Sequence, residues 1–364
     1  MVLAGGGGSR PTAADVGRLA GVSPTTVSFV LNDRQDQVIT QATRQRVLDA
    51  VRELGYRPNR AAQGLRTNRT ATIGYVTDEA AVDPFAGGAI AGAHDFARRH
   101  RSMLLVVHTN RDPRIRRSAI EDLLDRQVDA ILFAVVGTRR VTLPEIIVKV
   151  PAVLVNCFTV QSSLVSSLPV VLPDEEAGGY AAARVLLDAG HREIALLLGT
   201  AGSWASRKRL RGIRRALTEA GVDPRTTHLE HGNFRADSGY QLTRQVLAGS
   251  RSAGSRLAGS RSAGSRRPTA LLCGNDRMAY GAYLALGEAG LRIPEDMSVM
   301  GYDDQADLAA DLHPALSTVR LPYYAMGSWA AEQLFPRSVA PGIGPTYLPC
   351  PVVLRDSIAS ITGL

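Results

Sequence analysis

Cysteine is scarce in this sequence, and its distribution does not suggest disulfide bonds. Only Cys157, Cys273 and Cys350 are present. An odd number of widely separated cysteines indicates a reducing compartment rather than a disulfide framework. No apolar run approaches the length of a membrane span, and the opening residues MVLAGGGGSR lack the apolar core of a signal peptide. We therefore expect a cytoplasmic protein without a membrane partner, which disfavours a secreted solute-binding protein.

The signatures of common enzymes are also missing. The chain contains no G-x-S-x-G elbow, no P-loop ending in Gly-Lys-Ser/Thr and no H-E-x-x-H motif. The Gly-rich start follows no strand, so it is not a dinucleotide fingerprint. His228 and His231 are close in sequence, but no further His or Cys joins them, so a metal site is not expected. The sequence predicts no catalytic residues, no metal and no cofactor.

Positive charge is concentrated in two segments. The net charge is +8. Residues 10–69 carry ten Arg and five acids, whereas residues 249–267 carry five Arg and no acid. A basic N-terminal region would help to neutralise DNA phosphates, although a basic surface alone is usually only a solvated face.

Residues 20–32, AGVSPTTVSFVLN, are typical of the second half of a helix-turn-helix. Gly21 suits the turn, Ser23 is a good N-cap, and Pro24 suits the first helical position, where its missing N–H has no intrahelical partner. The side chains expected to pack inward are Val27, Val30 and Leu31. Those expected on the opposite side are Thr25, Ser28 and Phe29. A short helix with hydroxyl residues near its N-terminus suits the DNA major groove, although an ordinary surface helix fits the same pattern.

A helix is expected on each side of this segment. Thr12, followed by Asp15, predicts one helix start, and Thr40 predicts another helix, which Gly55 would end. The first helix is expected to bury Val16, Leu19 and Ala20. The third is expected to bury Val47, Leu48, Val51 and Leu54. Three short helices around one small core would form a DNA-binding headpiece.

The segment after the third helix contains a helix break. Pro58 disfavours helical continuation, and Asn59 could cap a further helix over residues 60–65. Such a helix is too short to be stable alone in water, and Gly64 weakens it further. From these residues alone, a flexible linker is expected.

From residue 71 onward the sequence alternates between strands and helices. Strands are expected at 72–77, 103–108, 129–135 and 152–156, with helices at 86–100 and 114–127. A second series has strands at 193–198, 227–230, 269–273 and 298–301, with helices at 175–189, 206–220, 236–248 and 276–290. This repetition predicts an α/β protein with two doubly wound lobes of parallel sheet.

Residues 249–267 interrupt that plan. They lie in a tandem repeat that begins at residue 248, AGSRSAGSRL and then AGSRSAGSRR. Gly, Ser and Arg cannot bury enough apolar surface to fold, so a disordered loop insertion is expected. An extra basic arm that touches DNA is the alternative.

Polar side chains follow several of the expected strands. Asp303 follows strand 298–301, Arg209 follows 193–198 and Asn275 follows 269–273. Together they offer hydrogen-bond acceptors, a planar donor fork and an amide, while Phe85 could stack on a sugar or base. Each of the four could instead be a helix cap or structural partner, and Asp174 is expected to be a plain N-cap.

An ordered series of motifs closely resembles the LacI/GalR family of bacterial transcription regulators. The series begins with AGVSPTTVSFVLN and VLDAVRELGYRPNRAAQGLRTNRTATIGYV. It continues with RKRLRG at 207–212, CGNDRMAYGA at 273–282, IPEDMSVMGYDD at 293–304 and LSTVR at 316–320. Such a series over nearly the whole chain is far more specific than any single motif.

The resemblance implies an N-terminal all-α helix-turn-helix headpiece and a two-lobed periplasmic-binding-protein-like core with an effector cleft at the carboxyl ends of the strands. The implied divisions are a disordered tail (1–9), the headpiece (10–56), a hinge helix or linker (57–70), the N-terminal lobe (71–170 with 319–347) and the C-terminal lobe (171–318 with 348–364). The family forms dimers and tetramers. No heptad tail follows residues 358–364, which disfavours a tetramer built by a C-terminal coiled coil.

The resemblance also assigns residues. Base-facing positions match Pro24, Thr25 and Phe29, phosphate contacts match Thr26 and Ser28, and further DNA contacts match Asn32, Tyr56, Asn59, Ala62 and Leu65. Leu65 matches an apolar wedge that bends DNA from the minor groove. Phe29 departs from the commoner basic or polar residue, so half-site preference cannot be transferred. Effector contacts match Phe85, Arg209, Asn275 and Asp303.

These assignments predict a transcriptional repressor that binds operator double-stranded DNA as a homodimer and responds to a small molecule, most often a sugar in this family. Nucleobases and nucleosides are the minority effectors. The alternatives are a sugar- or nucleoside-binding protein without a DNA role, and an enzyme built on the same lobes.

Overall fold

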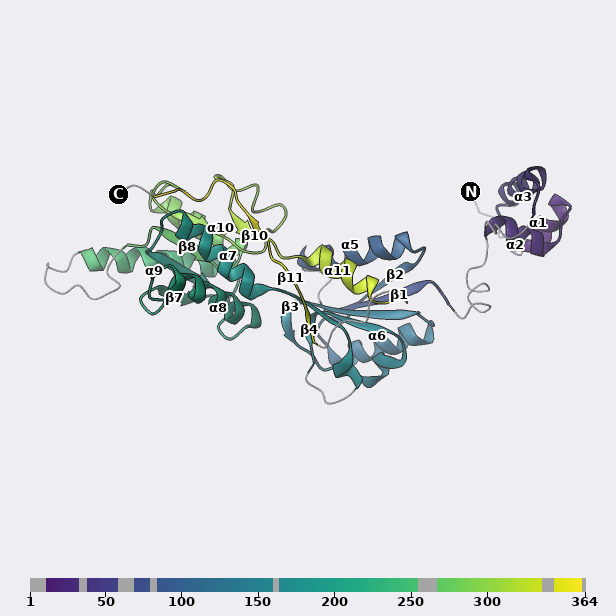
Figure 1. Ribbon diagram of the computed structural model, residues 1–364, viewed down its shortest axis with the longest axis horizontal. Coiled ribbons are helices and arrows are strands. Elements are labelled where there is room, and N and C mark those ends of the chain that lie inside the picture. Colours follow the sequence, from purple (N-terminus) through teal and green to yellow (C-terminus); the bar gives the residue numbers. More distant parts are fainter. Residues whose placement is uncertain are drawn as a thin grey trace, which may run out of the picture. The chain divides into compact units, whose positions relative to one another are not determined.

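The computed structural model describes residues 11–32, 38–57, 69–78, 84–159, 164–254, 267–335 and 344–361 (Figure 1). The chain divides into two compact units, Met1–Thr70 and Ala71–Leu364. The second unit contains two parallel sheets, each with helices on its faces.

The first unit contains three short helices, α1 (Ala13–Ala20), α2 (Pro24–Leu31) and α3 (Gln41–Glu53). The N-terminal ends of α1 and α2 are fixed by capping residues that the sequence predicts. Thr12 and Asp15 form a reciprocal capping box, and Ser23 Oγ accepts from the Thr26 amide at 3.1 Å. The helices enclose one small core, made of Val16, Ala20, Val27, Val30, Val47 and Ala50.

Two expected core residues of this unit are not buried. Leu19 is 47% exposed and Leu48 is 37% exposed. Successive helical residues are rotated by about 100°. In α1 the buried face runs from Val16 to Gly17, which places Leu19 beyond its edge. In α3 it is centred near Val47 and Ala50, with Leu48 outside it.

The first sheet of the second unit has six parallel strands in the order β2-β1-β3-β4-β5-β11. They are β1 (Thr72–Thr77), β2 (Met103–His108), β3 (Ala130–Arg140), β4 (Ala152–Phe158), β5 (Val170–Pro173) and β11 (Thr346–Leu348). Two short 3-10 helices, η1 (Glu145–Lys149) and η2 (Leu164–Ser167), flank β4. We call this sheet and its helices the N-lobe.

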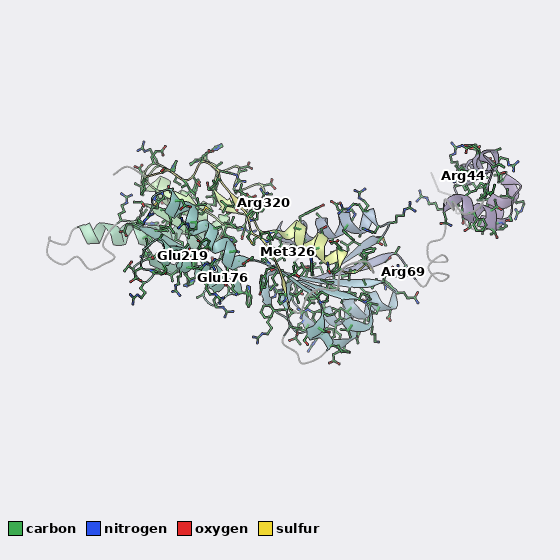
Figure 2. All side chains as sticks on the ribbon, in the orientation of Figure 1. Arg44, Arg69, Glu176, Glu219, Arg320 and Met326 are labelled. Atoms are coloured by element: carbon green, nitrogen blue, oxygen red, sulfur yellow. The ribbon has the colours of Figure 1, made fainter. Side chains whose placement is uncertain are left out.

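Both faces of this sheet are covered. Helices α5 (Pro84–Arg99) and α11 (Tyr323–Glu332) pack on one face, where Met326 is fully buried (Figure 2). Helix α6 (Pro113–Asp125) covers the other. Neighbouring residues of β3 point to opposite faces, as the two-residue period of a strand requires. Leu132 packs in the core under α5 and α11, and Phe133 packs in the core under α6.

The second sheet, with its helices, forms the C-lobe. Its four parallel strands have the order β7-β6-β8-β9, and their bounds are β6 (Ile194–Leu198), β7 (His228–His231), β8 (Ala270–Cys273) and β9 (Ser298–Met300). Helices α7 (Glu175–Asp188) and α8 (Trp204–Glu219) cover one face, and α9 (Ala236–Gly254) and α10 (Asp276–Glu288) cover the other. A separate antiparallel pair joins β10 (Thr318–Val319) and β12 (Val352–Val353).

Glycines bring α7 and α8 into close contact. A side chain on Gly179 would collide with the backbone of Arg209, and one on Gly212 would collide with the carbonyl of Glu176. The two helices can therefore approach through their backbones, which sets the start of α7 against α8.

Several elements differ from the sequence expectations. β3 continues to Arg140 rather than ending at residue 135, and α8 begins at Trp204 rather than at 206. β5, β10, β11 and β12 were not expected, because these strands of two to four residues stand outside the regular alternation of strands and helices from which β7, β8 and β9 were predicted. α9 extends to Gly254, so the first residues of the expected disordered insertion are helical. Residues 255–266 of that insertion and the expected tail, 1–9, lie outside the described residues.

Candidate functional site

The two sheets place polar side chains at the positions where open α/β sheets bind ligands. In each sheet the strand order reverses beside the first strand, between β1 and β3 in the N-lobe and between β6 and β8 in the C-lobe. Ligands of doubly wound folds bind at the carboxyl ends of strands beside such a reversal. Asp78 directly follows β1, Arg209 lies in the helix after β6, and Asn275 follows β8.

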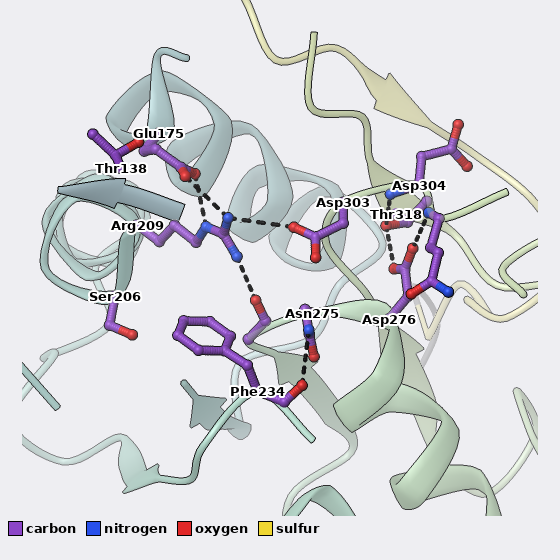
Figure 3. Close-up of polar contacts among 12 residues, drawn as sticks. Thr138, Glu175, Ser206, Arg209, Phe234, Asn275, Asp276, Asp303, Asp304 and Thr318 are labelled. Carbon is purple, nitrogen blue, oxygen red and sulfur yellow. Dashed lines mark hydrogen bonds and ion pairs between the residues drawn. The ribbon is translucent and has the colours of Figure 1, made fainter. Parts of the chain in front are cut away.

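Arg209 is the centre of a buried ionic cluster in the C-lobe (Figure 3). Its Nε donates to Glu175 Oε2 at 2.7 Å and its Nη2 donates to Glu175 Oε1 at 3.0 Å. Nη2 also donates to Asp303 Oδ1 at 3.4 Å, and Nη1 donates to the Gly274 carbonyl oxygen. The guanidinium lies 3.6 Å from the centre of the Tyr302 ring. Burial opposes the charged form of Arg209, but the carboxylates of Glu175 and Asp303 raise its pKa overall.

Asp303 is held in an unusual environment. It is only 8% exposed, and burial raises the pKa of its carboxyl well above the usual value, although Arg209 acts in the opposite direction. Its φ is 109°, a conformation that non-glycine residues rarely adopt, and that of Asp304 is 50°. Backbone strain of this kind concentrates at functional sites.

Asn275 and Asp174 act as helix caps. Asn275 Oδ1 accepts from the Met278 amide at 2.9 Å, and its Nδ2 donates to the Phe234 carbonyl oxygen at 3.1 Å (Figure 3). Asp174 Oδ1 accepts from the Ala177 amide at 2.9 Å, as expected. The side chain of Phe85 lies outside the described residues.

Sequence reasoning missed Glu175. Two acids in the first turn of a helix are an ordinary complement to its dipole, so Glu175 and Glu176 look alike in the sequence. In the structure, Glu175 is buried against Arg209, whereas Glu176 pairs with Lys208 and Arg211. Only the packing of α7 on α8 distinguishes them.

A second polar cluster was also missed, at the carboxyl end of β1. The buried carboxylate of Asp78 accepts from Thr109 Oγ1 at 2.5 Å, from Arg116 Nη2 at 3.1 Å and from Arg139 Nη2 at 2.8 Å. Burial would raise the pKa of Asp78, but the threonine and the two arginines lower it overall. The carboxylate is therefore ionised and links three elements of the N-lobe.

Aromatic side chains join the two lobes. The rings of Phe158, at the end of β4, and Trp204, at the start of α8, have centres 4.8 Å apart. A cavity of about 370 Å³ lies nearby at the start of α7, with Trp204, Lys208 and Tyr347 among its lining residues. Glu175 of the ionic cluster lines this cavity, whereas Arg209, Asn275 and Asp303 do not. The candidate ligand site is therefore the ionic cluster, with the cavity beside it.

The exposed face of α2 carries no charge. Pro24, Thr25 and Asn32 are exposed, whereas Thr26, Ser28, Phe29 and Tyr56 are partly buried. Asn32 Nδ2 donates to the Ser28 carbonyl oxygen at 2.8 Å and to its Oγ at 3.2 Å. No acidic side chain of this helix would repel a phosphate. Asn59, Ala62 and Leu65 lie outside the described residues.

Among the residues that the structure describes, no group of three or more His, Cys, Asp or Glu could hold a metal ion. No helix in that part of the chain is long and apolar enough to cross a membrane.

Comparison with known proteins decides the family. Residues 12–59 match the model of bacterial regulatory proteins of the lacI family, and residues 183–358 match a periplasmic binding protein-like domain. The chain is 31% identical to the ribose operon repressor of Haemophilus influenzae, over 96% of this chain and 99% of that protein. The chain belongs to the lacI family of bacterial regulatory proteins.

Other lacI-family proteins match over similar lengths. A PurR transcriptional repressor of Vibrio vulnificus is 34% identical over 90% of this chain and 91% of its own length. Among solved structures, a lac repressor dimer bound to operator and the anti-inducer ONPF is 29% identical, with a TM-score of 0.73, and covers 96% of this chain and 100% of that one. The expected fold class, with a helix-turn-helix headpiece and a periplasmic-binding-protein-like core of parallel sheets, is confirmed. As a lacI-family regulator, the chain combines a DNA-binding domain with an effector-binding core.

Proposed function

We propose that this lacI-family regulator is a repressor that binds operator DNA as a homodimer and changes its DNA affinity when a sugar binds the core. One observation carries the proposal. The same chain presents an uncharged, hydroxyl-bearing α2 helix and a buried Arg209 cluster at the reversal point of a parallel sheet. Relatives named as repressors, and a lacI-family structure from Enterococcus faecium with bound ribose, support it.

In the headpiece, the proposal assigns Pro24, Thr25 and Phe29 to base edges. Thr25 is exposed near the N-terminus of α2, where recognition helices contact bases. Thr26 and Ser28 are assigned to phosphates. The apolar ring of Phe29 can contact a thymine methyl group but cannot hydrogen-bond a base.

Further contacts extend toward the core. The proposal assigns Asn32 and Tyr56 to further DNA contacts, and Asn59, Ala62 and Leu65 to a hinge over residues 57–70 that orders on the minor groove. Since so short a helix is unstable alone, its order would depend on DNA and on the second protomer. Effector binding would then act by favouring or melting the hinge.

In the core, the proposal places the effector between the N-lobe and the C-lobe. The expected boundaries at 170/171 and 347/348 fall inside β5 (Val170–Pro173) and β11 (Thr346–Leu348), which both belong to the N-lobe sheet. Asp303 and Arg209 are its principal contacts, because both are ionisable and buried, Asp303 after β9 and Arg209 in α8.

Asn275 already makes two hydrogen bonds within the chain, to the Phe234 carbonyl oxygen and from the Met278 amide. Its proposed role is therefore to position the site more than to donate hydrogen bonds to the effector. Phe85 is assigned to stacking.

The proposal also includes a cytoplasmic location and the absence of catalysis. Its support is the family, whose named relatives are transcriptional repressors.

Two substitutions in α2 test the DNA-binding assignment. Thr25→Ala should change preference at one or two base pairs, by about 1–3 kcal/mol each, because a base-edge contact is lost. Ser28→Ala should weaken all sites about equally, since phosphate contacts carry no sequence information. Selection of binding sites from random DNA measures both effects. If the Thr25→Ala protein selected the wild-type motif, the assignment of Thr25 would be wrong. If the wild-type protein selected no motif, the result would favour the alternative of a ligand-binding protein without a DNA role.

A further inference from the structure

The guanidinium of Arg209 is already occupied by a carboxylate of its own chain. Nε and Nη2 donate in parallel to the two oxygens of Glu175, at 2.7 and 3.0 Å. The side chains are 5% and 4% exposed, so solvent does not loosen this pair. Two parallel N–H···O bonds are the geometry by which arginine recognises the carboxylate or phosphate of a ligand.

The remaining donors of Arg209 cannot form a second fork. The other Nη2 hydrogen points to Asp303, and one Nη1 hydrogen bonds the Gly274 carbonyl oxygen. Of the five N–H groups of a guanidinium, one therefore remains. One face of the planar group is covered by the Tyr302 ring. A single N–H suits a hydroxyl oxygen and does not suit a bidentate anion.

Carboxylates outnumber the cation in this cluster. Glu175 and Asp303 face one guanidinium, and no described residue donates a hydrogen bond to the second oxygen of Asp303. An anion that approaches the guanidinium fork would therefore meet the carboxylate of Glu175, whereas a ligand hydroxyl could hydrogen-bond the second oxygen of Asp303. At the end of β1, Arg116 and Arg139 both pair with the buried Asp78, so each of these cations already has a carboxylate partner within the chain.

Helix packing holds Glu175 in this place. The close backbone contacts at Gly179 and Gly212 fix the first turn of α7 beside α8. Glu175 immediately follows the N-cap Asp174, where the helix dipole favours a negative charge. The carboxylate is thus supported both by Arg209 and by its own helix.

We propose that Glu175 is a specificity-determining residue that fills the fork of Arg209, so that the core selects neutral polyhydroxyl effectors and rejects carboxylated or phosphorylated ones. The inference rests on the proposed function, in which the effector contacts Arg209 and Asp303. It adds the chemical class that this site excludes and the residue that excludes it.

The test compares Glu175→Gln with Glu176→Gln in the full-length protein. Each change removes one carboxylate from the first turn of α7, but only Glu175 contacts Arg209. Calorimetry measures the binding of paired probes, glucose with glucuronate and ribose with ribose 5-phosphate, at constant ionic strength. Wild type and Glu176→Gln should bind only the neutral member of a pair. Glu175→Gln should shift the ratio of affinities toward the charged member by about tenfold or more, the change that one charge-assisted hydrogen bond carries.

Two outcomes would overturn the inference, a third would contradict the proposed effector, and a fourth would support the role of Glu175. Equal selectivity in all three proteins would overturn the inference. The inference would also be overturned if glucuronate or ribose 5-phosphate displaced a neutral sugar from the wild-type protein with equal affinity. This measurement uses the wild-type protein alone, so it does not depend on whether a variant folds. Wild type that binds operator but none of the neutral probes would contradict the proposed sugar effector. A gain of glucuronate binding only in Glu175→Gln would still support the role of Glu175.

Discussion

Replacing Arg209 by methionine should destabilise the core far more than its single lost charge would suggest. Methionine keeps much of the side-chain length but removes the cation between two buried carboxylates. Glu175 and Asp303 are 4% and 8% exposed, so neither can turn to solvent without moving its helix or strand end. Breaking a buried ion pair by removing one partner typically costs about 3–5 kcal/mol. At about 2 °C per kcal/mol for a domain of this size, the melting temperature should fall by roughly 6–10 °C.

Arg211→Met is the matched control on the same helix. Arg211 also pairs with a carboxylate, Glu176, at 2.9 Å, but its side chain is 68% exposed. Exposed ion pairs contribute about 0–1 kcal/mol, so the melting temperature should fall by at most about 2 °C. Adding Glu175→Gln to Arg209→Met should recover part of the loss, because one of the stranded charges is removed.

Thermal unfolding followed by circular dichroism, at pH 7 and again near pH 4.5, measures these effects. The deficit of Arg209→Met should shrink at the lower pH, since burial raises the pKa of Asp303 and its protonation removes one of the stranded charges. Equal losses for Arg209→Met and Arg211→Met at both pH values would refute the claim that burial gives the Arg209 cluster its energetic weight.

Two further predictions concern Asp303 and the aromatic contact between the lobes. Burial raises the pKa of the Asp303 carboxyl above its unfolded value, so the stability that it contributes is present at low pH and lost as the pH rises through the raised value. Asp303→Asn should therefore melt higher than wild type at pH 7 and equally near pH 4, with loss of the effector response; a lower melting temperature at pH 7 would contradict this. Trp204→Ala should weaken effector binding by about two- to tenfold in calorimetry, because the contact with Phe158 joins the lobes and such ring pairs contribute about 0.5–1.5 kcal/mol, whereas Trp204→Phe should stay near wild type. Unchanged affinity in Trp204→Ala would exclude a role for that contact.

The sequence by itself determined the local features of this protein. The capping box at Thr12, the N-cap at Ser23 and the first-turn position of Pro24 all occur as expected, because each depends on atoms within about four residues of chain. The long strands and helices of the core were also predictable, since their apolar periods extend over enough residues to be read. The series of family motifs also indicates the family without any information on tertiary contacts.

Only the tertiary structure decided which side chains meet. Glu175 and Arg209 are 34 positions apart, and Asp78 and Arg139 are 61 apart, so no local pattern joins them. Short strands such as β5 (Val170–Pro173) exist because neighbouring strands supply their hydrogen bonds, and those neighbours come from distant parts of the chain.

The difference between Glu175 and Glu176 shows the physical reason. The two acids are adjacent, identical in chemistry and equally suited to the start of a helix. Successive helical side chains point about 100° apart, so once glycine contacts dock α7 on α8, one carboxylate is turned toward Arg209 and the other toward the surface. The sequence supplies both charges, and the docking of two helices determines which one is buried at the candidate site.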